Sequence, residues 1–129
     1  MTAQALLESV VLGYMECALW SSCDDEGNEL DGLYELYDFA DEANASIHET
    51  IQDWLDLLDV EDIDWRSGWS PEQLGHDFWL TRNGHGAGYW DRYSGADLRE
   101  DLGNVLSALC KPYGTSDVYV GDDGKLYVT

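Results

Sequence analysis

The sequence predicts a single α+β domain, with N-terminal helices packed against a small antiparallel sheet made of two hairpins and an intervening helix. Its length of 129 residues, with 44% hydrophobic residues, 6 Trp and 8 Tyr, is sufficient for one core and indicates one domain over residues 1–129. Helically spaced apolar residues dominate the first half, about residues 1–65. Aromatic, strand-favouring runs mark the second half, about residues 66–129.

Three segments carry the apolar spacing of helices. Residues 2–20 are largely apolar with few charges, which predicts a buried helix. In residues 38–59 apolar residues recur at steps of three and four, so one stripe should face the core and leave acidic residues on the opposite surface. Residues 98–109 repeat in the same way, and Lys111 with Pro112 should end this third helix.

Between the second and third helices the pattern predicts a helical turn and a hairpin. Ser70 followed by Pro71 is typical of a helix start, and we expect the turn to end before Gly75. Residues 77–82 and 88–92 are aromatic and strand-favouring, and the intervening Asn-Gly-His-Gly sequence is a hairpin signal.

A second hairpin is predicted near the C-terminus. Residues 118–120 and 126–128 are short runs of Val, Leu and Tyr, and they flank the turn sequence Gly-Asp-Asp-Gly-Lys. The order helix, loop, helix, hairpin, helix, hairpin therefore completes the expected α+β domain.

The charge of the chain is very negative and unevenly distributed. There are 27 Asp and Glu against 6 Lys and Arg, a formal net charge of -21, and residues 1–65 hold 18 of the acids and no Lys or Arg. Such a surface repels phosphates, which argues against direct nucleic-acid binding through basic contacts and against docking to anionic membranes. Partners should therefore be basic.

The cellular location is also an expectation from composition. No run of 18 apolar residues occurs, and the N-terminal segment lacks the basic region of a secretory signal, so we expect no membrane span and a cytoplasmic protein. Cys17, Cys23 and Cys110 are an odd number without a Cys-x-x-Cys pair, which fits reduced intracellular thiols.

A calcium loop beginning at Asp24 is the first candidate site in the sequence. Oxygen ligands fall at its positions 1, 3, 5 and 12, the last being Glu35. Position 6, where the sharp turn needs glycine, is Glu29, and the usually apolar position 8 is Asp31. We therefore expect a solvated acidic loop without a metal.

His76 and His85 are the second candidate, as metal ligands or as a general acid and base. The sequence offers them no His-Glu-x-x-His pair, nucleophile elbow or phosphate-binding glycine loop. We therefore expect no enzymatic activity, no cofactor and no metal. A small metal-binding protein stays open as an alternative.

The aromatic residues Phe78, Trp79, Tyr89 and Trp90 could stack on a ligand, but core packing is the stronger interpretation. If residues 77–82 form a strand, Phe78 and Trp79 must point to opposite faces of the sheet.

Two further expectations concern polar side chains. Arg82 and Arg92 are expected to pair with nearby carboxylates. Tyr34 and Tyr37 lie among the acids of residues 31–42, where they either bind a partner or pack, because Tyr is enriched at interfaces generally.

The stretch GHDFWLTRNGHGAGYWDR at residues 75–92, with the Gly-Asp-Asp-Gly-Lys turn, resembles small acidic proteins encoded by bacteriophages and mobile elements. That group has no settled biochemical role, so the resemblance implies an origin, and a place in a host bacterial cell, rather than a mechanism. No catalytic residue is carried over from it. It favours counter-defence proteins, among which small acidic inhibitors that imitate DNA are common.

The leading hypothesis is therefore a DNA-mimic inhibitor, whose carboxylates occupy the positive groove of a basic nucleic-acid-binding protein of the host or a competitor. Tyr34 and Tyr37 are its candidate aromatic contacts. The candidate acidic residues are Asp24, Asp25, Glu26, Glu29, Asp31, Glu35, Asp38, Asp41, Glu42, Glu49, Asp53, Asp56, Asp59, Glu61, Asp62 and Asp64.

Two alternatives stand beside it, in addition to the small metal-binding protein. The acidity could serve solubility or adaptation to high salt, because net charge speaks to solubility as readily as to function. The absence of Lys and Arg from residues 1–65 argues against solubility alone. The chain could also be an adaptor that binds a protein through Tyr34, Tyr37 and exposed Trp, with its charge incidental.

Overall fold

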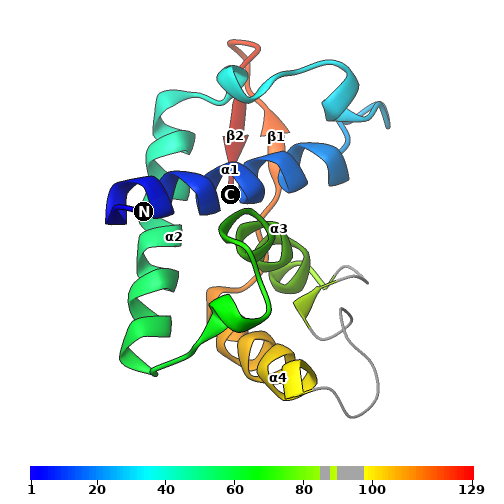
Figure 1. Ribbon diagram of the computed structural model, residues 1–129. Helices are drawn as coiled ribbons and strands as arrows, with labels where there is room; N and C mark the ends of the chain where they lie inside the picture. The colour runs from blue at the N-terminus through cyan, green and yellow to red at the C-terminus, as the bar shows by residue number, and fades with distance from the viewer. Residues whose placement is uncertain (85–87, 90–97) are drawn as a thin grey trace.

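The structure, a computed structural model, describes residues 1–84, 88–89 and 98–129 (Figure 1). These residues form a mostly helical α+β fold with a small antiparallel sheet of two strands. The elements are α1 (Ala3–Ser21), α2 (Asp41–Val60), α3 (Pro71–Arg82), α4 (Leu98–Cys110), β1 (Val118–Val120) and β2 (Leu126–Val128).

The three helices expected from apolar spacing are confirmed as α1, α2 and α4, and the C-terminal hairpin is confirmed as β1 and β2. The side chain of Thr2 caps α1 by accepting a hydrogen bond from the backbone N–H of Ala5 at 3.1 Å. In the hairpin Tyr119 lies opposite Tyr127, and their rings stack with centroids 5.7 Å apart.

The prediction of a first hairpin is wrong. Residues 77–82 form the second half of α3, and Tyr89 lies outside any strand. The expected start signal is real, since Ser70 Oγ accepts a hydrogen bond from Gln73 N at 3.1 Å and a proline follows at the first helical position. The helix continues for twelve residues because Gly75 does not end it. The remainder of the expected second strand, residues 90–92, lies outside the described residues.

The Asn-Gly pair that we interpreted as a hairpin turn is the C-terminal cap of α3. Asn83 donates from its backbone N–H and its side-chain amide to the Trp79 carbonyl, at 3.3 and 3.0 Å. Gly84 follows with a φ of 69°, the left-handed conformation that commonly follows a helix. Asn and Gly favour this conformation in helix caps and in hairpin turns alike, so the pair alone does not distinguish the two.

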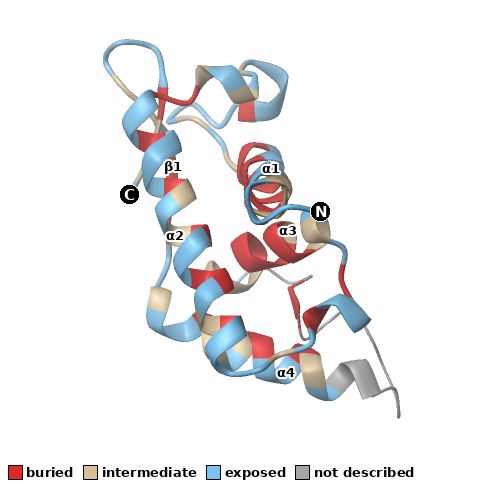
Figure 2. Ribbon diagram, turned by 60° about the vertical axis from the view of Figure 1, so that its left-hand side comes forward, coloured by how far each residue is buried: buried red, intermediate tan, exposed pale blue. Residues whose placement is uncertain are grey.

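The closest helix contact joins α1 and α3 through two glycines. A Cβ atom on Gly13 would overlap the backbone carbonyl of Glu72, and one on Gly75 would overlap the carbonyl of Val10. Both positions must therefore lack a side chain for the two helix backbones to meet. Figure 2 shows that α3 and the facing side of α1 are among the most buried parts of the molecule.

Aromatic side chains from four parts of the chain fill the core. Trp54 of α2 stacks on Phe78 of α3 with centroids 4.8 Å apart and planes within 9°. Tyr113 meets both rings edge-on, and Tyr14 of α1 lies against Phe78 at 5.7 Å. Aromatic pairs at these distances stabilise beyond the area they bury. Core packing, rather than an exposed stacking platform, is thus the observed role of Phe78, Trp79 and Tyr89, while Trp90 lies outside the described residues.

The helical conformation also corrects the expectation that Phe78 and Trp79 face opposite sides. Neighbouring helical residues are about 100° apart, so both rings enter the core, and both are almost fully buried. Trp79 uses its Nε1 to donate to Ser21 Oγ at 2.7 Å, which joins α3 to the end of α1.

Arg82 pairs with no carboxylate of the described residues, contrary to expectation. Its guanidinium donates to the carbonyls of Gly114 and Tyr113 and to the hydroxyl of Tyr14, at 2.9, 3.0 and 3.0 Å. It thus joins α3, α1 and the segment after α4. Arg92 lies outside the described residues.

Substitution of Gly75 by alanine tests the glycine contact. The added methyl group should force α1 and α3 apart and lower the free energy of unfolding by about 2–3 kcal/mol, although alanine favours helix by about 1 kcal/mol. Chemical denaturation of the purified variant measures this. Gly32→Ala is the matched control, since nothing lies within 4 Å of a Cβ there. Equal stability of the two variants would contradict a close backbone contact.

Candidate functional site

The outer surface of α2 carries the most regular arrangement of acidic residues. At about 100° per residue, its exposed carboxylates fall within about 120° of the helix circumference, opposite the buried stripe. Figure 2 shows this division into a buried and an exposed side along α2. We call this set the α2 acidic face; it consists of Asp41, Glu42, Glu49, Asp53, Asp56 and Asp59.

The spacing of the α2 acidic face approaches that of a nucleic-acid strand. From Asp41 to Asp59 the helix rises about 27 Å, which gives one carboxylate per about 5 Å. One strand of duplex DNA carries one phosphate per about 3.4 Å of axis. The face therefore presents roughly two-thirds of the linear charge density of a single DNA strand.

The acidic candidates are predominantly exposed and lack basic partners. Within residues 1–84, 88–89 and 98–129, none forms an ion pair with Lys or Arg. Only Asp24 and Asp38 are half-buried. The exposed candidates are Asp25, Glu26, Glu29, Asp31, Glu35, Asp41, Glu42, Glu49, Asp53, Asp56, Asp59, Glu61, Asp62 and Asp64.

Some of these carboxylates also serve the fold. Asp53 Oδ2 accepts a hydrogen bond from the Tyr113 hydroxyl at 2.6 Å, which ties α2 to the segment after α4. Burial and the nearby Asp53 carboxylate raise the pKa of Tyr113 well above its ordinary value. Asp38 Oδ2 accepts from the backbone N–H of Glu35 at 2.8 Å in a reciprocal capping box. Asp56 Oδ1 accepts a hydrogen bond from the Gln52 amide at 2.9 Å within α2, so this bond ties the helix to no other element.

The C-terminal end of α2 holds acidic residues at positions where they disfavour folding. Asp59, Glu61 and Asp62 lie at the negative end of the helix dipole, where anions are unfavourable. Asp62 also has a φ of 54°, at a cap position where glycine is usual. The cap is a Schellman motif, since Ile63 N donates to the Leu58 carbonyl at 2.9 Å and Asp62 N to the Asp59 carbonyl at 3.1 Å.

A second group of acids lies in the loop that follows α1. Asp24 accepts hydrogen bonds from the backbone N–H groups of Glu26 and Asn28, both at 2.9 Å, and from the Asn28 amide at 3.2 Å. These bonds lower the pKa of Asp24 below its ordinary value of 3.8, with the Asn28 backbone bond as the largest cause. The oxygens that would begin a calcium loop are therefore used to shape the turn itself.

Two acids in the C-terminal hairpin extend the acidic surface, and our sequence analysis missed them. Asp122 and Asp123 lie with Glu42 of α2 around a shallow depression of about 410 Å³. Asp123 Oδ2 accepts a hydrogen bond from the Tyr127 hydroxyl at 2.6 Å, which lowers the pKa of Asp123 and raises that of Tyr127 to about 12. Because the charges of the second half nearly balance, we assigned the acidic surface to the first half alone. The turn sequence around Asp122 and Asp123 nevertheless indicated that they are exposed.

The aromatic candidates differ in exposure. Tyr37 is 84% exposed, whereas Tyr34 is half-buried against the core. Trp20, at the end of α1, is 61% exposed and stacks on His76 with centroids 6.4 Å apart, beside a depression of about 440 Å³. His76 Nδ1 also lies 3.3 Å from the buried carboxylate of Asp77, which accepts hydrogen bonds from Trp69 and Gln73. His76 is thus held by structural contacts, and His85 lies outside the described residues.

In the ranges that the structure describes, no three His, Cys, Asp or Glu side chains are grouped so as to hold a metal ion. None of the helices in these ranges is long and apolar enough to cross a membrane.

Replacing Asp62 with glycine should stabilise the protein. Glycine relieves the left-handed backbone and removes a charge from the negative end of α2, so the free energy of unfolding should rise by about 1 kcal/mol. Denaturation curves measure this. Asp62→Ala removes the same charge but keeps a Cβ atom, so an equal rise in both variants would exclude relief of the backbone as the cause.

The lowered pKa of Asp24 predicts the direction of an acid effect. A carboxyl whose pKa is lower in the folded state stabilises the fold above its unfolded pKa of about 3.8, and this contribution is lost as the pH falls through the folded pKa. In carbon NMR titrations the Asp24 carboxyl should titrate below 3.8 in the protein. A peptide of residues 22–30 is the control, and identical titration in peptide and protein would contradict the hydrogen-bonded loop.

The family models, the curated proteins and the solved structures that were searched contain no match to this chain. The resemblance to proteins of bacteriophages and mobile elements therefore stays a prediction, and the acidic surfaces described above are what a functional proposal must rest on.

Proposed function

We propose that this protein is a DNA-mimic inhibitor, which places an acidic surface in the positive groove of a basic nucleic-acid-binding protein. The observation that carries the proposal is the α2 acidic face, which averages one carboxylate per about 5 Å along about 27 Å of helix. A groove that grips phosphates would attract such a row, because it offers negative charge at a comparable density.

Three features of the acidic residues support a function beyond stability. The carboxylates of α2 have no Lys or Arg partners among the described residues. Several follow one another at three or four residues, as Asp53, Asp56 and Asp59 do, and like charges at this spacing destabilise a helix. The acids at the end of α2 oppose the helix dipole. Charges kept at a cost in folding free energy are expected where a partner uses them.

The inhibitor acts by competition and carries out no chemistry of its own in this proposal. It requires a basic partner, a protein of the host cell or of a competing element, and no direct contact with nucleic acid. The partner's Lys and Arg side chains would exchange DNA phosphates for carboxylates, so the affinity should fall steeply with salt.

An adaptor function is the second candidate, and the exposure of Tyr37 and Trp20 favours it. Aromatic side chains at this level of exposure are frequent anchors of protein interfaces. In that case Tyr37→Ala or Trp20→Ala should abolish partner binding, whereas neutralising carboxylates should have little effect.

The decisive experiment removes charge from one surface and not from another. The immobilised protein first captures candidate partners from nuclease-treated bacterial lysate, and duplex DNA elutes those whose binding it competes with. Fluorescence anisotropy then measures how well the protein displaces labelled DNA from an eluted partner. The triple variant Glu49→Gln, Asp56→Asn, Asp59→Asn should displace DNA about tenfold less well than the original protein.

The matched control is the triple variant Glu8→Gln, Asp101→Asn, Asp117→Asn, which removes equal charge from exposed acids outside the proposed surface. It should retain most of the activity. Equal loss in both variants would assign the effect to net charge, and an affinity independent of salt would exclude mimicry of DNA.

A further inference from the structure

Among the residues that the structure describes, none pairs with the outer edge of the C-terminal hairpin, on the β1 side. Gly121 N donates to the Lys125 carbonyl at 2.8 Å, and Thr129 N donates to the Asp117 carbonyl at 3.0 Å. Since hydrogen-bonded pairs alternate along an antiparallel ladder, the backbone groups of Tyr119 point toward β2. Those of its neighbours in β1 must then point away from β2.

The two edges of the hairpin differ in whether another segment of the chain is hydrogen-bonded to them. On the β2 side, the carbonyl of Leu126 accepts a hydrogen bond from Ala40 N at 2.9 Å, so the chain before α2 covers this edge. On the β1 side, no described residue makes a backbone hydrogen bond to the outward N–H and C=O groups of Val118 and Val120. An uncovered strand edge is a template on which another strand can pair.

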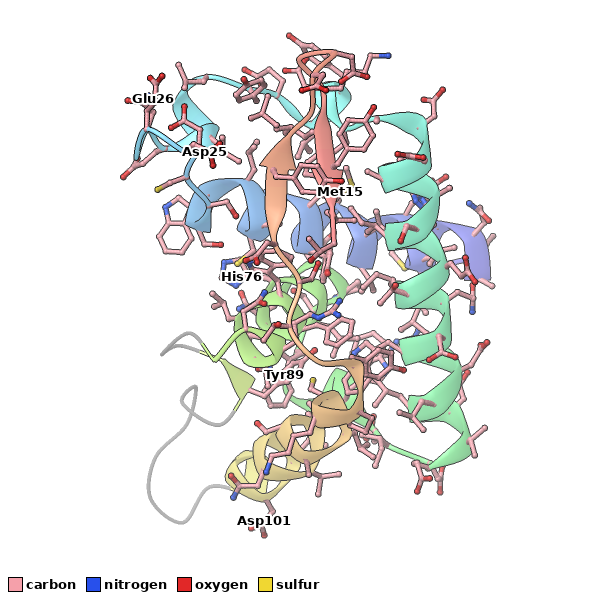
Figure 3. The ribbon with its side chains drawn as sticks, turned by 180° about the vertical axis from the view of Figure 1, so that it is seen from behind. Met15, Asp25, Glu26, His76, Tyr89 and Asp101 are labelled. Carbon is pink, nitrogen blue, oxygen red and sulfur yellow. The ribbon has the colours of Figure 1, made fainter. Side chains whose placement is uncertain are left out.

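A groove of about 350 Å³ lies along this open edge. One wall is β1. The opposite wall is the loop that follows α1, which we call the acidic loop, and its Asp24, Asp25 and Glu26 line the space. Figure 3 shows Asp25 and Glu26 on the loop that lies beside β1, on the side away from β2. The groove thus joins unpaired backbone groups on one side to carboxylates on the other.

We infer that this groove binds an extended, basic segment of the partner protein as a third strand of the sheet. The backbone of the segment would pair with Val118 and Val120, and its Lys or Arg side chains would meet the carboxylates of the acidic loop. Strand addition of this kind takes its affinity from main-chain hydrogen bonds and its selectivity from the side chains. The inference rests on the proposed function in taking the partner to be a basic protein.

Charge selects this occupant over a second copy of the chain. Two molecules that each carry a formal charge of -21 repel each other, and pairing of two β1 edges would bring both acidic loops together. A basic segment meets no such repulsion and supplies the opposite charge that the groove lacks among its described lining residues.

The test uses a fluorescein-labelled peptide of alternating lysine and threonine, about nine residues long, as the probe. Fluorescence anisotropy should show binding to the full-length protein that weakens as salt is raised. Two further peptides carry backbone N-methyl groups at every lysine or at every threonine. Because alternate N–H groups of a strand point to opposite edges, one methylated peptide should lose affinity and the other should keep it.

Val120→Pro tests the protein side of the same contact. Proline removes the outward N–H without removing a hydrogen bond of the β1–β2 ladder, and an edge strand tolerates it. The affinity for the peptide should fall about fivefold relative to Val120→Ala, which keeps the N–H. Hydrogen exchange of the Tyr119 and Tyr127 amides verifies that the hairpin stays folded in both variants.

Strand addition would be overturned if Val120→Pro and Val120→Ala bound the peptide with equal affinity, or if both methylated peptides bound the protein equally. Either result would show that the peptide is bound through charge alone. A failure to bind the peptide, together with dimers that Val120→Pro dissociates in light scattering, would assign the edge to a second copy. These outcomes leave DNA displacement by the α2 acidic face unaffected, so the failure of one proposal is distinguishable from the failure of the other.

Discussion

The backbone contact between α1 and α3 is the constraint on which the rest of the structure depends. With Gly13 and Gly75 facing the other helix, the two backbones come close enough for the aromatic residues of α3 to reach α1 on one side and α2 on the other. Tyr14, Phe78 and Trp54 then form a continuous row of ring contacts across three helices, in which Phe78 and Trp54 are stacked and Tyr14 is tilted against Phe78. Because the core is complete on the inner side of α2, its outer side is free to carry charged residues that lie outside the core.

The sequence was sufficient to predict elements whose apolar residues recur regularly. The stripe of α2 separates buried residues such as Ile47 and Trp54 from the exposed acids, and it therefore predicted both the helix and its acidic side. α1, α4 and the C-terminal hairpin followed from the same kind of pattern.

The sequence was not sufficient for α3, for reasons that lie in particular residues. Four consecutive residues of its second half, Asp77 to Leu80, are buried, so this half lacks the alternation between polar and apolar faces that distinguishes a helix from a strand. Gly75 was interpreted as an end, whereas it is a site of close approach to α1. The predicted acidic surface lacked Asp122 and Asp123 for a similar reason, because only the fold brings these two residues close to Glu42. The open edge of β1 is likewise a property of tertiary arrangement.

The carboxylates on α2, which have no basic partner among the described residues, have a consequence for the free protein. In solution a diffuse layer of cations balances their charge, so added salt should screen their repulsion and favour the folded state. The same salt would weaken the attraction to a positive partner. A partner that binds the folded chain supplies the missing counter-charges and stabilises the fold by mass action. The molecule would thus be most stable in its complex, where the basic side chains of the partner would neutralise the carboxylates of α2.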